Sequence, residues 1–248
     1  MATIKRFWLV APFALSLAFV SNAPSRAGEL TDAIKARNVA LVRSLLAAGK
    51  DVHERVMGDY PLNVAAVFGP VEMVTVLLEA GANLEQPSRE GLRPLHNAAI
   101  SGNAEIVALL IQRGAAVDAK DKKGRSPLVS FAAFGVKNIE IARTLLAAGA
   151  DPNIEDENHE AALNYAVFSG DVELGKLLIA AHADINHGND TGEPPISSAT
   201  QHGMHYEFAK LLIDAGADVN QLDKDGKTPL YYVEDPAMRK LLIDAGAK

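Results

Sequence analysis

The chain has 248 residues, a net charge of −7 and no cysteine. Disulfides, thiolate chemistry and cysteine-ligated metals are therefore excluded. The acidic balance disfavours nucleic acid, because phosphates attract proteins mainly through basic side chains, and an anionic lipid surface would repel it. A basic or neutral protein is the natural electrostatic complement.

Residues 1–27 differ from the rest of the chain. Lys5 and Arg6 precede an apolar run from Phe7 to Val20, and small residues follow. This layout is typical of a secretory signal peptide. The run of 14 residues is shorter than the ~20 that cross a bilayer as a helix. We therefore expect a periplasmic or secreted protein.

Two cleavage sites fit the small-x-small pattern, and we favour the one after Ala27 over the one after Ala23, which Pro24 would follow. An uncleaved N-terminal anchor remains the alternative. Cleavage after Ala27 would remove three basic residues and no acidic residue, so the net charge would fall from −7 to −10.

The remainder is built from a repeating unit, seen most clearly between Gly91 and Asp118. A short Ala-rich segment begins at Pro94 and breaks at Gly102, and a longer apolar-periodic segment ends at Gly114. Proline is favoured in a first helical turn, and glycine adopts the left-handed conformation that ends many helices. The unit therefore predicts a helix, a tight turn, a second helix and a polar connection.

The unit recurs in two independent registers. The opening proline is seen at Pro61, Pro94, Pro127, Pro195 and Pro229, with Ala162 in its place once. The closing glycine is seen at Gly49, Gly81, Gly114, Gly149, Gly216 and Gly246, with His182 in its place once, after gaps of 30 to 35 residues. A period near 33 residues predicts a stacked solenoid.

These residues resemble the ankyrin-repeat family, whose pattern of Asp-x-x-Gly-x-Thr-Pro-Leu and Leu-Leu-x-x-Gly-Ala-Asp-x-Asn reads almost whole in residues 223–230 and 211–220. The resemblance covers residues 28–248. It implies an all-α solenoid of about seven helix-turn-helix units, with β-turn fingers and a concave binding surface. Residues 29–49 are expected to form an N-terminal cap repeat and residues 229–248 a C-terminal cap repeat.

Each finger is expected to turn at a glycine with positive φ, because glycine alone adopts it without steric cost. These glycines are Gly58, Gly91, Gly124, Gly192 and Gly226, and His159 takes the place once. A valine at Gly91 should then cost roughly 1–2 kcal/mol of stability. We expect mild backbone strain at His159.

Catalytic motifs are not found: the sequence has no nucleophile elbow, phosphate loop or dinucleotide fingerprint. We therefore expect no enzyme activity and no cofactor. His96 is expected to bond to the backbone of the next finger, and the acidic stretches at 155–157 and 184–190 to form solvated finger tips. His202 and His205 could bind a metal or another ligand, although they lack a fixed acidic partner.

The resemblance places certain side chains on the concave surface. We expect a partner-binding stripe there, because exposed apolar patches mark interaction sites; in the alternative interpretation these rings fold against neighbouring helices. The stripe consists of Tyr60, Val67, Phe68, Ile100, Phe134, Phe168, His202 and Tyr231. Its rim consists of the finger residues Met57, Arg89, Lys122, Lys123, His159 and Leu222.

The expected function is binding of an exported partner protein by a chain that is monomeric when unbound. Such a module would inhibit, protect or assemble its partner. The alternative is a metal- or ligand-binding accessory protein that uses the region of His202 and His205.

Overall fold

The structure is a computed structural model that describes residues 28–201 and 205–248. The expected signal peptide and His202 lie outside these residues. The described helices are α1 (Glu29–Lys35), α2 (Val39–Ala47), α3 (Pro61–Phe68), α4 (Val71–Glu79), α5 (Pro94–Ser101), α6 (Ala104–Gln112), α7 (Pro127–Ala133), α8 (Ile139–Ala147), α9 (Ala162–Ser169), α10 (Val172–Ala180), α11 (Pro195–Thr200), α12 (Tyr206–Asp214), the 3-10 helix η2 (Pro229–Tyr232) and α13 (Pro236–Asp244).

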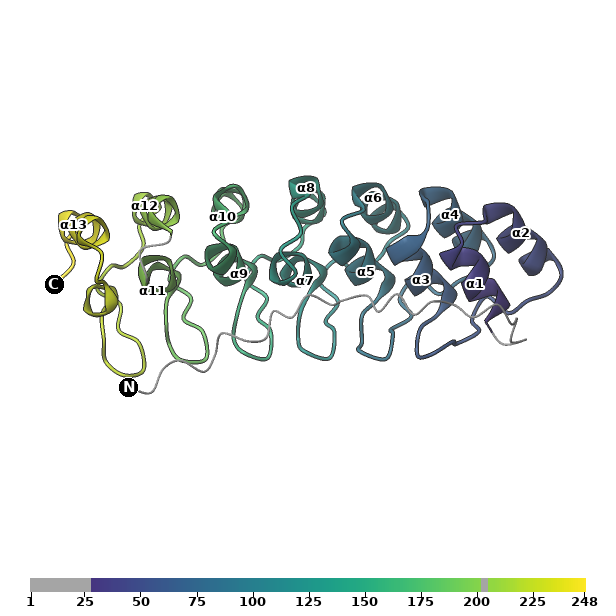
Figure 1. The fold of residues 1–248 in the computed structure, drawn as a ribbon, viewed down its shortest axis with the longest axis horizontal. Helices are drawn as coiled ribbons and strands as arrows, with labels where there is room; N and C mark the ends of the chain where they lie inside the picture. The colour runs from purple at the N-terminus through teal and green to yellow at the C-terminus, as the bar shows by residue number, and fades with distance from the viewer. Residues whose placement is uncertain (1–27, 202–204) are drawn as a thin grey trace.

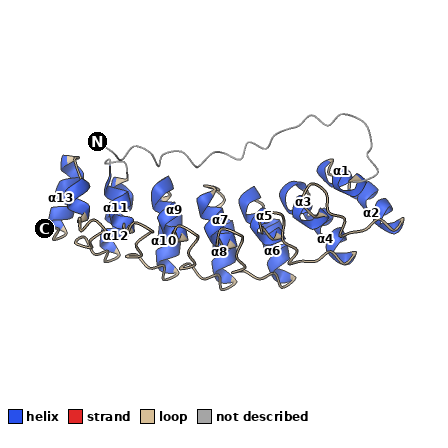
Figure 2. Ribbon diagram, turned by 90° about the horizontal axis from the view of Figure 1, so that it is seen from below, coloured by secondary structure: helices blue, strands red, loops and turns tan. Residues whose placement is uncertain are grey.

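The helices pair in chain order into seven units that stand side by side (Figure 1). In each unit the first helix lies between the fingers and the second helix, which forms the outer row. The row bends gently, with the first helices on the inner side of the bend (Figure 2). The described residues therefore confirm the predicted all-α solenoid.

Position in the stack explains the composition of each helix row. A first helix is packed between two neighbours, as α5 is between α3 and α7, so six consecutive residues of α5, from Pro94 to Ala99, are buried. Small alanines allow this close approach. An outer helix buries only one stripe, which in α6 consists of Ile106, Val107 and Leu110. This stripe has the periodicity that a half-exposed helix requires.

The turn chemistry follows the predicted register. The five finger glycines have φ between 70° and 101°, and His159 has a φ of 57°. An Asp or Asn three residues before the turn closes most fingers: the Asp121 carboxylate accepts the backbone N–H groups of Lys123 and Arg125 at 2.8 and 2.9 Å. The predicted left-handed finger residues are confirmed.

Backbone hydrogen bonds connect consecutive fingers. Lys122 donates its N–H to the carbonyl oxygen of Glu90 at 3.2 Å, and Glu157 donates to Lys123 at 2.8 Å. Equivalent bonds join the remaining neighbours: Arg89 to Gly58, Asp190 to Asn158, and Lys224 to Thr191. Each finger therefore fixes the position of the next, and the whole finger row is one continuous edge.

The two ends of the array differ from its middle. Lys35, Arg37 and Arg43 are exposed on the first unit. In the last unit the first helix shortens to η2, and the Asp235 side chain caps α13 by accepting the N–H of Met238 at 2.7 Å. Across the described part of the chain, none of the helices has the length and apolarity needed to traverse a bilayer.

Candidate partner-binding face

The phenylalanine and aliphatic residues of the predicted stripe lie at the C-terminal ends of the first helices, and their exposure varies. Phe168 in α9 is 62% exposed and Phe134, which follows α7, is 37% exposed. Phe68 at the end of α3 is half-buried and packs against the core. Val67 and Ile100 are also half-buried. Phe168 is therefore the most open apolar side chain in this register.

The two tyrosines of the stripe occupy other registers. Tyr60 precedes α3 and is half-buried, with the guanidinium carbon of Arg55 5.7 Å from its ring centroid. Tyr231 lies in η2 and is 63% exposed, with the Lys227 ammonium 4.1 Å from its ring centroid. In sequence register Tyr231 corresponds to His96 and not to Phe168, so it extends the face at its C-terminal end.

Finger tips add a second row of exposed side chains. Met57 is 91% exposed and has a φ of 55°, although methionine is disfavoured in this conformation. Leu222 on the last finger is 57% exposed. Neither packing nor backbone geometry of the folded chain favours an apolar side chain at this exposed, strained turn. Met57 is therefore a candidate contact residue.

His96 has the structural role that the sequence predicted. Its Nδ1 accepts the backbone N–H of Arg93 at 3.2 Å, and its Nε2 lies 3.0 Å from the carbonyl oxygen of Arg125 in the next finger. Since Nδ1 accepts, Nε2 carries the proton and donates. Burial lowers the pKa of His96 to about 4, so the ring stays neutral at physiological pH.

One group of side chains on this face was not found from the sequence. We call the residue two positions before the start of each first helix the pre-helix position. Its occupants are Asp59, Leu92, Arg125, Glu160, Glu193 and Lys227. The position faces the C-terminal end of its own first helix: the Arg125 guanidinium carbon lies 5.4 Å from the Phe134 ring centroid, and the Glu193 Oε1 accepts Gln201 Nε2 at 2.8 Å.

Glu160 and Glu193 make the centre of the face acidic. Burial, reinforced by Asp156, Glu193 and Asp190, raises the pKa of Glu160 to about 7. Burial also raises the pKa of Glu193, and Asp223 adds to the effect. The sequence signal for this pair was a carboxylate at the same register position in two consecutive fingers.

The expectation that residues 155–157 form only a solvated tip is wrong for Asp156. This side chain is 7% exposed and accepts the N–H groups of Asn158 and Glu160 at 2.8 and 3.1 Å. Tyr165 also donates its hydroxyl to it. Asp156 closes its finger as Asp121 does, and a buried carboxylate requires these donors.

Replacement of Glu160 by glutamine should stabilise the protein at high pH. Because burial raises the folded-state pKa, protonated Glu160 favours folding below its ordinary pKa, and this contribution is lost as the pH rises through about 7. Glutamine stays neutral and keeps the acceptor for Asn189 Nδ2. We expect Glu160→Gln to add about 1–2 kcal/mol to the free energy of unfolding at pH 8, allowing for partial solvent exposure, and almost nothing at pH 4.5.

Urea unfolding at both pH values measures this difference. The control is Glu105→Gln, which makes the same exchange at an exposed position of α6. A glutamine variant at 160 that is less stable than the wild type at pH 8 would contradict the assignment.

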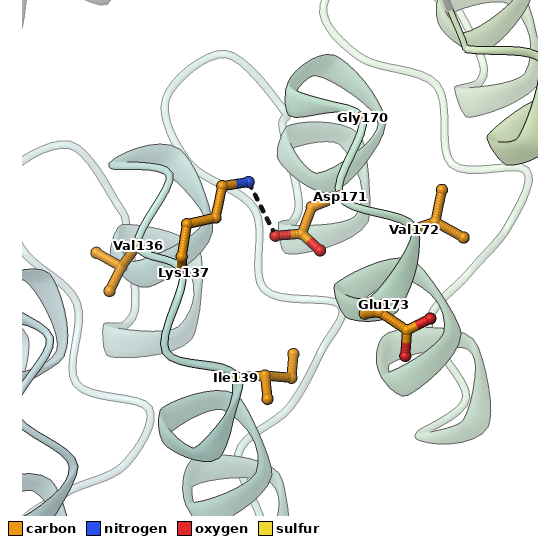
Figure 3. A pocket seen from close by; sticks show the side chains of 7 residues that line it. All are labelled: Val136, Lys137, Ile139, Gly170, Asp171, Val172 and Glu173. Atoms are coloured by element: carbon orange, nitrogen blue, oxygen red, sulfur yellow. Dashed lines mark hydrogen bonds and ion pairs between the residues drawn. The ribbon is translucent and has the colours of Figure 1, made fainter.

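The described residues hold no cluster of three or more metal-ligating side chains. They do contain a shallow depression of about 380 Å³ at the turns between paired helices, lined by Val136, Lys137, Ile139, Gly170, Asp171, Val172 and Glu173 (Figure 3). Its main polar contact is the ion pair between Lys137 Nζ and Asp171 Oδ2 at 3.2 Å. Val136, Lys137 and Ile139 form one wall. Paired charges and an open shape give this depression no evident chemistry.

Stacked helix pairs with projecting fingers define a repeat scaffold, and the comparisons with known proteins identify the repeat. The family described as "Ankyrin repeats (3 copies)" matches residues 82–156 and 163–248, and the single "Ankyrin repeat" description matches residues 57–89. The chain belongs to the ankyrin-repeat family. Members of this family serve as protein–protein interaction modules, and the fold is a scaffold without catalytic activity of its own.

Solved structures show the same fold. One of 536 matching chains is the ankyrin repeat domain of Bcl-3, described as a unique member of the IkappaB protein family. It is 21% identical in sequence with a TM-score of 0.77, and the match covers 87% of this chain and 97% of that one. No curated protein matches the sequence. At this identity the likeness concerns the fold alone.

Proposed function

We propose that this chain is an exported interaction module that holds a partner protein on its inner face, with the finger tips along the rim. Phe168 carries this proposal. Folding alone gives no reason to expose 62% of a phenylalanine ring. This residue belongs to α9, one of the first helices, which lie on the inner side of the bend (Figure 2). Exposed aromatic side chains are the commonest anchors of protein interfaces.

Rigidity favours this function. The first helices are packed on both sides and consecutive fingers are hydrogen-bonded, so the face changes little on binding and loses little conformational entropy. The signal-peptide pattern of residues 1–27 supports export. The partner would then be an exported protein that the module inhibits, protects or helps to assemble, and the unbound module would be monomeric.

Capture of partner from a periplasmic extract tests the proposal. The mature protein is immobilised as wild type, as Phe68→Ala plus Phe168→Ala, and as a matched control, Leu41→Ala plus Ile243→Ala. Leu41 and Ile243 are exposed apolar residues of outer helices, at 41% and 53% exposure. We expect the wild type and control to retain the same protein and the inner-face variant to lose about tenfold in affinity. Equal capture by all three proteins would refute the inner face as the binding site.

A further inference from the structure

Basic side chains and aromatic rings form pairs along the inner face. The cation lies over the ring in Arg55–Tyr60, Arg125–Phe134 and Lys227–Tyr231, with distances to the ring centroid of 5.7, 5.4 and 4.1 Å. In the second pair Arg125 also binds the Asp121 carboxylate, with Nη2 and Nε at 2.7 and 2.9 Å from Oδ2. The α7 repeat therefore holds an arginine between a carboxylate and a phenyl ring.

The next repeat keeps the surroundings of that arginine and lacks the arginine. Asp156 takes the place of Asp121 and closes its finger in the same way. Phe168 lies at the end of the neighbouring helix α9. Its position in the repeat is one residue earlier than that of Phe134. At the pre-helix position, however, Arg125 is replaced by Glu160. Among the described residues, Phe168 has no cation over its ring.

The negative charges of Glu160 and Glu193 are not balanced by basic side chains of the described residues. Within the described chain, neither Glu160 nor Glu193 forms an ion pair: Glu160 accepts Asn189 Nδ2 at 3.1 Å, and Glu193 accepts Ser198 Oγ at 2.9 Å and Gln201 Nε2 at 2.8 Å. These donors are neutral. The charges with the largest influence on Glu160 are those of Asp156, Glu193 and Asp190, which are all acidic, so an added cation would be attracted.

We propose that the surface formed by Phe168, Glu160 and Glu193 binds an arginine or lysine side chain from a basic segment of the partner protein. This rests on the proposed function and specifies the chemistry of its ligand. Arginine suits the site best, because its guanidinium plane stacks on an aromatic ring while its N–H groups bind a carboxylate. The partner would thus supply to the α9 repeat the basic side chain that Arg125 supplies to the α7 repeat.

Binding of a labelled arginine–serine–glycine repeat peptide, measured by fluorescence anisotropy at pH 8 and low salt, tests the proposal. The matched peptide carries citrulline, which keeps the shape of arginine without its charge. We expect the arginine peptide to bind about tenfold more tightly than the citrulline peptide. Equal binding of the two peptides would overturn the proposal.

Protein variants separate a specific site from general attraction by an acidic surface. Glu160→Gln plus Glu193→Gln should weaken arginine-peptide binding about tenfold, and Phe168→Leu several-fold. The control Glu105→Gln plus Glu207→Gln changes the net charge equally at exposed positions of α6 and α12 and should bind as the wild type does. Equal losses in both double variants would reduce the effect to nonspecific electrostatics and refute the site. Melting temperatures check that each variant is folded.

The two hypotheses fail separately. If the extract experiment retains its dependence on Phe68 and Phe168 but the arginine peptide does not bind, the interaction face stands and the basic ligand is wrong. If the peptide binds as expected but capture is independent of the phenylalanines, the cation site stands and the wider face is wrong.

Discussion

Gly91→Val should lower the free energy of unfolding by about 2–4 kcal/mol. The residue has a φ of 81°, which costs a β-branched side chain about 1–2 kcal/mol. The structure adds a second effect: a Cβ at Gly91 would lie 2.7 Å from the backbone nitrogen of Lys122. That nitrogen donates to Glu90, so the finger-to-finger bond would be displaced at a cost of about 1 kcal/mol or more. The estimate from φ alone is therefore too small.

Gly114→Val is the matched control for this prediction. Its φ is 88°, but a Cβ there would have no neighbour within 4 Å. It should cost only the roughly 1–2 kcal/mol of the backbone conformation. Urea unfolding of the two variants measures the difference. Equal destabilisation would show that the fingers are not in close contact at Gly91.

Gly175→Ala should destabilise the protein by about 1–2 kcal/mol, although alanine is the better helix former. In a helix interior this exchange normally gains up to about 1 kcal/mol. Gly175 lies in α10, however, directly under the fully buried ring of Phe208 from α12. An added Cβ would overlap the ring and overpack the interface, which typically costs about 1–3 kcal/mol.

A double-mutant cycle with Phe208→Leu tests this packing. Leucine should create a small cavity in the wild type and relieve the overlap in Gly175→Ala, so the two changes should compensate each other when combined. Thermal unfolding of the four proteins gives the coupling energy. Additive effects, or stabilisation by Gly175→Ala alone, would contradict the packing of Phe208 on Gly175.

These two glycines show what the sequence could and could not predict. The positive φ of Gly91 followed from its register, because turn geometry is local and repeats in every finger. The contact of Gly91 with Lys122 joins two fingers and depends on how far the repeats rotate against each other. Gly175 was overlooked for the same reason. Its lack of a side chain makes room for the ring of Phe208 from the following unit, and this contact becomes visible only after the helices are stacked.

The binding face was predicted to a similar extent. The register placed Phe168 at the end of its helix, but exposure distinguishes it from Phe68, which packs against the core. Glu160 and Glu193 were counted only in the net charge, since nothing in their local sequence indicates that burial raises their pKa. Long-range packing decides both properties.

The row of finger-to-finger bonds has a consequence for how such a molecule can change over generations. Nearly every finger presents the same donor to its neighbour and the same acceptor to the one behind. One whole unit can therefore be duplicated or lost, and the adjoining units still meet in the correct orientation. Duplication or deletion of a gene segment of this period can lengthen or shorten the solenoid without a new fold. The length of its inner face can therefore change by one repeat at a time.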